Sequence, residues 1–529
     1  GASGARLSRG GFGDNLTNGL ENYNKDIWAA RGTVELGGYG EPVLVRISGD
    51  YTKDKSNPRG GHRLIPGAVS GAPVLDNVFD TRGGLNDPVQ EIEAYGLAMN
   101  TPANLSDTVT FRSISAWRKD DTATPIDFDA LPAVDLDVPG LYLNEQISQE
   151  FQLLYEGDKL NGLVGFYYLD ASADTLFDVR LFTTFAGLTA FTQAEVDTET
   201  YAVFADFTYD FTEQLSLSLG GRYTWDERTA SIFRQNYLGG SPTFGGAGIP
   251  FGAPGTDFQG DAKFKKFTPR ASLSYKPTPD HNIYASFSQG FKGGGFDPRG
   301  VGVNAPTTNA SGIPSDDEVA SFLSFQPESV DSYEVGYKGS LLDGALNIAL
   351  AGFYTDYTDV QIPGSVACTV AGLPSFCGVI NNAGKATLKG IEFEASARLG
   401  EDLLAGGDRV MLSGSLGYID AEYDEYITNI GGVPTDVADF RSVQNTPEWT
   451  ASGTFSYTTP VGDGDLYLGT TLSYRSKTNQ FEIANPFIDQ EGFALLDANL
   501  VYNAPDKRWS IGLHGKNLTN KRYKTSGYT

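Results

Sequence analysis

Apolar and polar residues alternate along most of this 529-residue chain, in segments of about ten residues separated by turn residues. The clearest segment spans residues 201–211. Its odd positions carry Tyr, Val, Ala, Phe, Tyr and Phe, and its even positions carry Ala, Phe, Asp, Thr and Asp. Residues 215–220 and 466–475 repeat this pattern. An apolar face with aromatic residues at both ends indicates a strand that crosses a membrane and its two interfaces.

The links between these segments alternate between short and long. The short links are rich in Gly, Pro, Asp and Asn, as tight turns require, and lie at 37–42, 101–106, 156–159, 212–213, 277–280, 342–344, 460–464 and 504–506. The long links lie at 57–88, 121–140, 176–195, 231–262, 292–327, 361–383, 423–445 and 479–490. No stretch with helical periodicity of useful length competes with this pattern. It predicts an all-β fold, a transmembrane antiparallel β-barrel of about eighteen strands from 26–37 to 507–522, with short periplasmic turns and long extracellular loops.

Composition agrees with this class. The chain is rich in Gly (64), Phe (32) and Tyr (27), and it has no run of eighteen apolar residues that could form a membrane-spanning helix. The net charge of −27 argues against nucleic-acid binding, because phosphate contacts need Lys and Arg. We attribute the acidity to long polar loops; the alternative is divalent-cation binding at the surface.

The two cysteines, Cys368 and Cys377, lie nine residues apart in one Gly/Pro-rich link. In an oxidising compartment this pair predicts a disulfide that restrains the loop. Metal binding by two thiols without a nearby histidine is a poor alternative, because His62, His281 and His514 lie far apart in sequence. We therefore expect no metal site and no cofactor.

Five segments resemble motifs of the TonB-dependent outer-membrane receptors. They are 288–296 (SQGFKGGGF), 327–338 (PESVDSYEVGYK), 382–386 with 390–394 (NAGKA and GIEFE), 445–449 (NTPEW) and 514–523 (HGKNLTNKRY). The last resembles the family's penultimate-strand signature. The matches occur in the family's order and cover about residues 280–523. The earlier part of the chain agrees only through its strand pattern.

The motif residues can also be interpreted without the resemblance. Glu334 and Lys338 alternate with the apolar residues of their strand, and Glu392 and Glu394 do the same. These charges should therefore face the barrel lumen. We interpret the motifs as structural; the alternative is that some lumen charges contact a plug or a solute.

The resemblance implies a twenty-two-stranded barrel closed by an N-terminal plug, in the outer membrane of a Gram-negative bacterium. Against that pattern, residues 1–529 are expected to be the receptor β-barrel domain alone. We expect the plug, three first strands and a signal peptide to be missing before residue 26, and one closing strand to be missing after residue 529. The chain is then expected to start and stop on the outer side.

The resemblance further implies active import of a scarce solute, driven by the TonB complex of the inner membrane. A ferric siderophore or other iron complex is the leading solute, with cobalamin and saccharides as alternatives. Haem fits less well, since His62 is the one histidine in an expected outer loop. Outer-membrane lipid and lipopolysaccharide are expected to surround the barrel.

Candidate solute contacts are loop residues that combine cations and aromatic rings, which suit anionic, planar chelates. One group is Arg59, His62 and Arg63, and the other is Lys292, Phe296 and Arg299. The alternative is that these are solvated loop charges.

Two other classes of function were weighed. A passive porin-like channel for saccharides or other small solutes needs both chain ends on the periplasmic side, and the expected strand directions disagree. An enzyme would need a nucleophile and base at one rim, and no Gly-x-Ser-x-Gly motif lies near His281 or His514. We therefore expect that the protein is not an enzyme.

Overall fold

A computed structural model describes residues 1–528 except 39–40, 68–69, 184, 371–372, 383 and 431–432. Within residues 365–381, and at 429, it describes several residues by their backbone alone. The predicted turn 37–42, loop 57–88 and motif 382–386 therefore lie partly outside the described residues.

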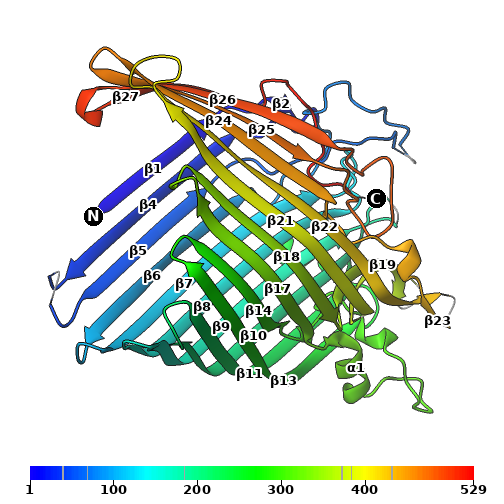
Figure 1. Cartoon of the computed structure of the whole chain (residues 1–529). Helices are drawn as coiled ribbons and strands as arrows, with labels where there is room; N and C mark the ends of the chain where they lie inside the picture. Colours follow the sequence, from blue (N-terminus) through cyan, green and yellow to red (C-terminus); the bar gives the residue numbers. More distant parts are fainter. Residues whose placement is uncertain are drawn as a thin grey trace.

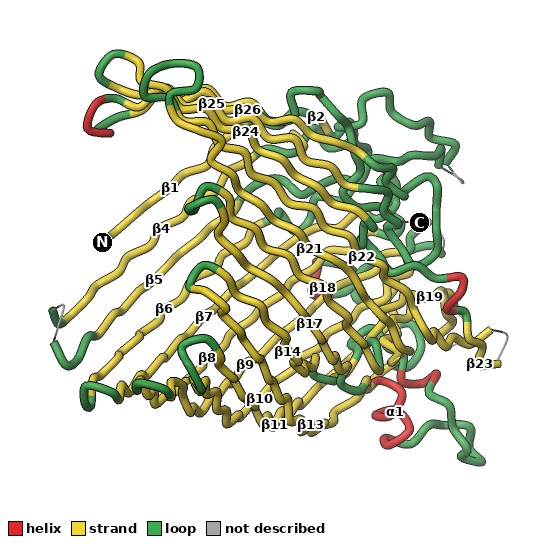
Figure 2. Tube along the Cα trace, viewed as in Figure 1, coloured by secondary structure: helices red, strands yellow, loops and turns green. Residues whose placement is uncertain are grey.

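In the described part of the chain, nineteen antiparallel strands of at least six residues follow one another in one continuous wall (Figure 1). They are β1 (Ala2–Arg9), β4 (Lys25–Leu36), β5 (Val45–Asp54), β6 (Glu91–Asn104), β7 (Val109–Asp127), β8 (Asp137–Glu156), β9 (Leu160–Arg180), β10 (Leu188–Asp210), β11 (Leu215–Leu238), β13 (Thr256–Thr278), β14 (His281–Lys292), β17 (Glu328–Leu341), β18 (Leu346–Thr358), β21 (Gly384–Glu401), β22 (Arg409–Ile430), β24 (Trp449–Val461), β25 (Gly464–Arg475), β26 (Phe493–Asn503) and β27 (Ser510–Gly515). The wall curves into a barrel, and Figure 2 shows short turns at one end and long loops at the other. The predicted fold class is confirmed.

The expectation that the chain starts on the outer side was wrong, because residues 2–9 form a further wall strand before the predicted first strand. These form β1, which pairs with β4 from Ala2 opposite Gly32 to Arg9 opposite Lys25. Since β4 runs toward a short turn, antiparallel β1 starts at the short-turn end rather than outside. β1 has no apolar stripe that a periodicity search could find, because its positions on the outer face are Ala2, Gly4 and Arg6.

Several strands are longer than the alternation predicted. β8, β9, β10, β11 and β13 contain 20, 21, 23, 24 and 23 residues, whereas about 9–11 residues suffice to cross a bilayer. The predicted loops 121–140, 176–195 and 231–262 shrink accordingly, and strand pairing continues through much of each. Outside the membrane a strand need not keep one face apolar, so its sequence no longer alternates. The wall is therefore tall along β7–β13 (Figure 1).

Short elements fill the long-loop end. They are β2 (Gly13–Asp14), β3 (Glu21–Asn22), β12 (Ile249–Pro250), β15 (Gly295–Phe296), β16 (Ser324–Phe325), β19 (Gln361–Val370), β20 (Leu373–Asn382), β23 (Val433–Asp436), α1 (Asp316–Leu323), and the 3₁₀ turns η1 (Pro242–Phe244), η2 (Gly302–Asn304) and η3 (Ala438–Phe440); η4 (Pro505–Lys507) lies in a short turn. The helix α1 was not predicted from sequence, although its Ser315 and Glu318 form a capping box. None of the described helices has the length and hydrophobicity to cross a membrane.

The two faces of the wall differ as predicted. On β10, Tyr201 and Val203 are exposed on the outer face, at 40% and 46%, whereas Ala202 between them is fully buried. Glu334 accepts a hydrogen bond from the Tyr284 hydroxyl at 2.6 Å, and Lys338 lies over the same ring. Lys338 and Glu394 both line a hollow of about 620 Å³ that spans neighbouring strands from β13 to β24. A hollow shared by so many strands lies on the concave side, so these charges face the lumen.

The end of the chain also differs from expectation. The predicted last strand, 507–522, is reduced to β27, because Asn517 and Asn520 have positive φ values of 49° and 52° and turn the backbone. Among the described residues, no ladder joins β27 to β1. The following segment instead reaches the outer loops near the start of the wall. The Arg522 Cζ atom lies 5.6 Å from the centroid of the Phe79 ring, and the ring centroids of Tyr528 and Phe128 are 5.2 Å apart.

Candidate ligand-binding face

The long link between β14 and β17, residues 293–327, folds against the inner side of the wall. Its Phe296 and Leu323, 6% and 2% exposed, form an apolar cluster with four wall residues, Ala194, Ala230, Ile232 and Phe258. Tyr201 faces outward. The pairing of β10, β11 and β13 places all four wall residues on the opposite face of the sheet. The loop therefore packs into the barrel mouth. Phe296 anchors it there, with its ring centroid 5.3 Å from that of Phe258.

Charged groups fix the turn after Phe296. The Arg299 guanidinium donates to both carboxylate oxygens of Asp297, at 3.0 Å (Nε–Oδ1) and 2.9 Å (Nη2–Oδ2). Arg234, a buried residue of β11, donates to the Arg299 carbonyl and to Thr192 Oγ1. Burial lowers the pKa of Arg234 to about 10, so it stays charged at neutral pH. Arg299 is thus part of the internal structure of this loop.

Lys292 ends β14 and is exposed. The backbone beyond it is held by Gln361 of β19, whose amide donates to Gly293 O at 2.9 Å and to Gln326 O at 3.0 Å. The amino group of Lys292 therefore extends from a fixed backbone position.

The second predicted group lies in the loop between β5 and β6. His62 Nδ1 lies 3.0 Å from the Asp80 carbonyl oxygen. Arg63 donates to the carbonyl of Asp129, in the loop after β7, at 2.5 Å. Arg59 is exposed. The six predicted residues thus occupy two separate loops, and Arg59 and Lys292 are the two that are exposed.

The predicted disulfide falls on the hairpin of β19 and β20. The ladder pairs Cys377 with Val366, two residues before Cys368 on the partner strand. The side chain of Cys368 lies outside the described residues, so this bond stays a prediction.

Aromatic residues form a band around the outer face below the loops. Tyr51, Tyr95 and Trp117 lie on successive strands, with ring centroids 6.5 Å and 5.6 Å apart. Tyr168 and Tyr201 continue the band, 5.0 Å apart. Such a band is typical of a membrane–water interface. The band therefore predicts the level at which the long strands would leave a membrane.

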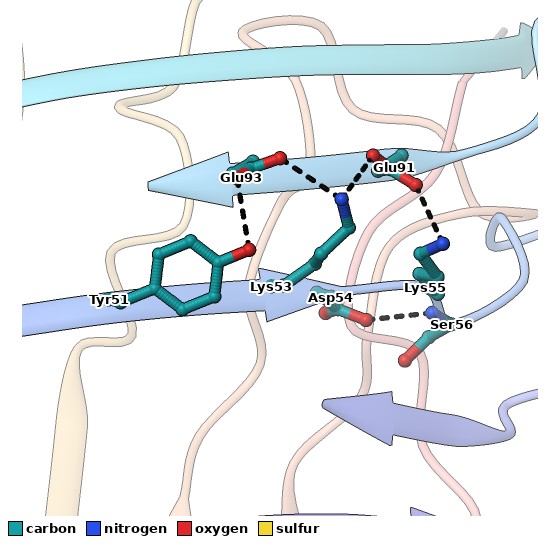
Figure 3. A network of polar contacts seen from close by, with 7 residues as sticks. All are labelled: Tyr51, Lys53, Asp54, Lys55, Ser56, Glu91 and Glu93. Carbon is teal, nitrogen blue, oxygen red and sulfur yellow. Dashed lines mark hydrogen bonds and ion pairs between the residues drawn. The ribbon is translucent and has the colours of Figure 1, made fainter. Parts of the chain in front are cut away.

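A polar network lies on the loop side of this band (Figure 3). Lys53 of β5 contacts Glu91 and Glu93 of β6 at 2.8 Å and 3.0 Å, and Lys55 contacts Glu91 at 3.2 Å. The Tyr51 hydroxyl donates to Glu93 at 2.9 Å. This network could not be predicted from sequence, because it depends on which residues of β5 and β6 lie directly opposite each other.

Comparison with known proteins identifies the class. The chain matches the model of the TonB-dependent receptor-like β-barrel family over residues 34–518, and it belongs to that family. This is a family of transporters and receptors rather than of enzymes. The match covers the barrel portion of such receptors.

Individual relatives are more distant. The chain is 24% identical to the pesticin receptor of Yersinia enterocolitica over 335 residues, 62% of this chain and 40% of the relative. The structure is similar to that of the ferric yersiniabactin uptake receptor FyuA of Yersinia pestis, with a TM-score of 0.71, 20% identity, and coverage of 100% of this chain and 72% of that one. The siderophore receptor PiuA of Acinetobacter baumannii gives a TM-score of 0.68 at 16% identity, covering 100% and 74%. The chain thus spans less than half the length of the curated relatives it first matches.

Proposed function

We propose that this protein imports a scarce solute, a ferric siderophore or another iron complex, across the outer membrane of a Gram-negative bacterium. The observation that carries the proposal is a barrel of the TonB-dependent receptor family with a folded loop layer over its mouth. The names of the relatives, a pesticin receptor, a ferric yersiniabactin uptake receptor and a siderophore receptor, support the solute class.

In this proposal Arg59 and Lys292 make the first contacts with the solute. Both are exposed cations on the loop face, and ferric siderophores commonly present anionic oxygens to solvent. His62, Arg63, Phe296 and Arg299 would act mainly by holding the two loops in place, since each already contacts other parts of the loops.

Energy for import would come from the TonB complex of the inner membrane, acting through a plug domain, which the matched barrel family does not include. The hollow on the inner wall, lined by Lys338, Glu394 and Ile348 among others, offers a surface on which a plug could pack. On the outer face, Lys53 and Lys55 lie at the level where lipopolysaccharide phosphates would meet the barrel.

The test measures the uptake of radioactive iron by iron-starved cells. The iron is supplied in the cells' own spent medium. A strain lacking this gene should lose uptake, and the wild-type gene should restore it only when TonB is present. Arg59→Ala combined with Lys292→Ala should lower uptake at limiting iron at least tenfold, since losing even one charge-assisted contact costs about 1.5–3 kcal/mol and about 1.4 kcal/mol is a factor of ten in affinity. Lys159→Ala, an exposed lysine at the opposite end of the barrel, is the control and should have no effect.

The same strains separate import from passive diffusion. Uptake that persists without TonB, together with a steady large conductance of the full-length protein in planar bilayers, would establish the porin-like alternative instead. Unchanged uptake in the double variant would exclude the assigned contacts while leaving the transport class intact.

A further inference from the structure

Three aspartates meet at the outer ends of β7 and β8. Asp127 ends β7, Asp129 lies two residues further on, and Asp137 begins β8, directly opposite Asp127 in the ladder. One carboxylate oxygen of each lies within 4.8 Å of the other two. The three residues belong to the tall part of the wall, on the loop side of the aromatic band.

Asp137 is the unusual member of this group. Its side chain is completely buried, and neither of its carboxylate oxygens has a hydrogen-bond partner among the described residues. A buried charge without a partner destabilises the fold, because the protein interior does not replace the water that solvates the charge. Such a carboxyl group is neutralised either by a proton or by a cation, and a cation between the three aspartates would supply charge to it.

The nearby arginine does not neutralise this group by itself. Arg180 of β9 is the ladder partner of Asp137, but its guanidinium Nε lies 3.7 Å from Asp178 Oδ2, another buried carboxylate. Its Nη2 donates to the Phe244 carbonyl at 3.5 Å. One guanidinium thus lies beside two buried carboxylates, Asp137 and Asp178, while Asp127 and Asp129 add further negative charge next to Asp137.

The other two carboxylates are already oriented by their own loop. Asp127 Oδ1 accepts the Ala130 backbone N–H, and Asp129 Oδ1 accepts the Leu131 N–H, both at 2.8 Å. Ala130 has a φ of +52°, which tightens the turn that positions these donors. The fold thus holds three oxygen ligands close together at little further cost in chain entropy.

We propose that Asp127, Asp129 and Asp137 bind one divalent cation that prefers oxygen ligands, of the Ca²⁺ type. Ca²⁺ takes carboxylate, carbonyl and water oxygens at about 2.3–2.6 Å, so two oxygens sharing one ion lie no more than about 5 Å apart. The observed separations meet this limit. A carboxylate-only set without His or Cys does not favour Zn²⁺ or Cu²⁺.

A cation here would join two loops. The Asp129 carbonyl accepts Arg63, and the Leu131 carbonyl accepts the Gly84 N–H at 3.0 Å. Asp127 Oδ2 also accepts the Leu85 N–H, at 3.4 Å. The ion would therefore order the β5–β6 loop, which carries Arg59, as well as the β7–β8 loop. The site is independent of the transported solute, and the ion would be a resident structural ligand.

The test is calorimetric titration of the full-length protein, purified in detergent and stripped with EDTA, with Ca²⁺ and separately with Mg²⁺. We expect one equivalent of Ca²⁺ to bind, with Kd about 10⁻⁴–10⁻³ M or tighter, as in extracellular sites. Asp137→Asn should weaken binding at least tenfold, and Asp129→Asn serves as a second variant should the first fold poorly. Asp297→Asn, a buried aspartate in another outer loop, is the control and should bind as wild type does.

Amide hydrogen exchange of residues 128–136 provides an independent readout. Ca²⁺ should slow exchange in the wild type and not in Asp137→Asn. Without metal, Asp137→Asn should exchange no faster than wild type, because it removes an unpaired buried charge. Absence of Ca²⁺ and Mg²⁺ binding, equal affinity in Asp137→Asn, or faster metal-free exchange in that variant would each overturn the proposal.

Discussion

Single side chains decide which charges on the outer face can meet a solute. A run such as Arg59, His62 and Arg63 looks uniform in sequence, yet Arg63 is bonded to the next loop and Arg59 is exposed. Acidic residues divide in the same way. Most are solvated, whereas Asp137 is buried without a hydrogen-bond partner among the described residues, and Glu318 accepts several hydrogen bonds.

Glu318 makes the loop around α1 sensitive to acid. Its carboxylate accepts the Ser315 and Thr308 N–H groups and the Thr307 hydroxyl, at 2.8, 3.1 and 2.8 Å. These bonds lower its pKa to about 2, from an ordinary value of 4.5. The stabilisation is therefore complete above pH 4.5 and is lost as the pH falls toward 2. Hydrogen exchange of residues 316–323 should accelerate over that range.

Glu318→Gln should show faster exchange in α1 already at pH 7 and a smaller change between pH 4.5 and 2. Asp317→Asn, on the same turn but exposed, is the matched control and should retain the acid dependence. If Glu318→Gln and wild type respond equally to acid, the capping box is not the titrating element.

At the scale of elements, the β14–β17 loop behaves as a folded unit seated on the inner wall. Its aromatic anchor, its ion pair and its capped helix each fix a different part of the loop. Local order of this kind is what a binding surface requires, since a preformed loop loses less conformational entropy when a ligand binds.

Phe296→Ala should detach this loop without unfolding the barrel. Truncating a buried phenylalanine costs about 3–5 kcal/mol, and here the loss falls on one loop. Trypsin should then cut after Arg299, which is folded against Asp297 in the wild type; mass spectrometry identifies the cut. Phe440→Ala, in a different outer loop and 76% exposed, should leave cleavage after Arg299 unchanged. Wild-type resistance in Phe296→Ala would show that the apolar cluster does not hold the loop.

At the scale of the whole molecule, the barrel wall is taller on one side than on the other. Strands β7–β13 rise beyond the aromatic band, whereas strands such as β14, β25 and β26 contain only 12, 12 and 11 residues. The tall side carries the three-aspartate group and supports the loop that packs into the mouth. The binding face is therefore built against one wall.

The aromatic band predicts where the membrane ends. Glu199 and Val203 flank Tyr201 on the outer face of β10, and both are exposed on the protein surface, so only lipid can distinguish them. In intact cells, a membrane-impermeant maleimide should label Glu199→Cys and leave Val203→Cys unlabelled. After the cells are dissolved in detergent, both should react. Equal labelling in intact cells would place the membrane boundary elsewhere.

Much of the wall could be predicted from sequence because lipid imposes a repeating constraint. Lipid-facing positions must be apolar at every second residue, so β4, β10 and β25 were evident. Where the constraint ends, prediction failed. β1 has Ala2, Gly4 and Arg6 on its outer face rather than an apolar stripe, and the outer halves of β8–β11 have water or loops on both sides. The site was predicted only as two clusters of loop charges.

The sequence by itself determined the class of fold, the sidedness of the barrel and the inward direction of charges such as Glu334 and Lys338, because these follow from period-two alternation and link length. Only the tertiary structure decided which loop residues are exposed, that Phe296 is an anchor, and that Asp127, Asp129 and Asp137 converge. Those outcomes depend on register and on loop packing between residues far apart in sequence, as in the bond between Arg63 and Asp129, which are 66 positions apart. Local alternation carries no information about such pairs.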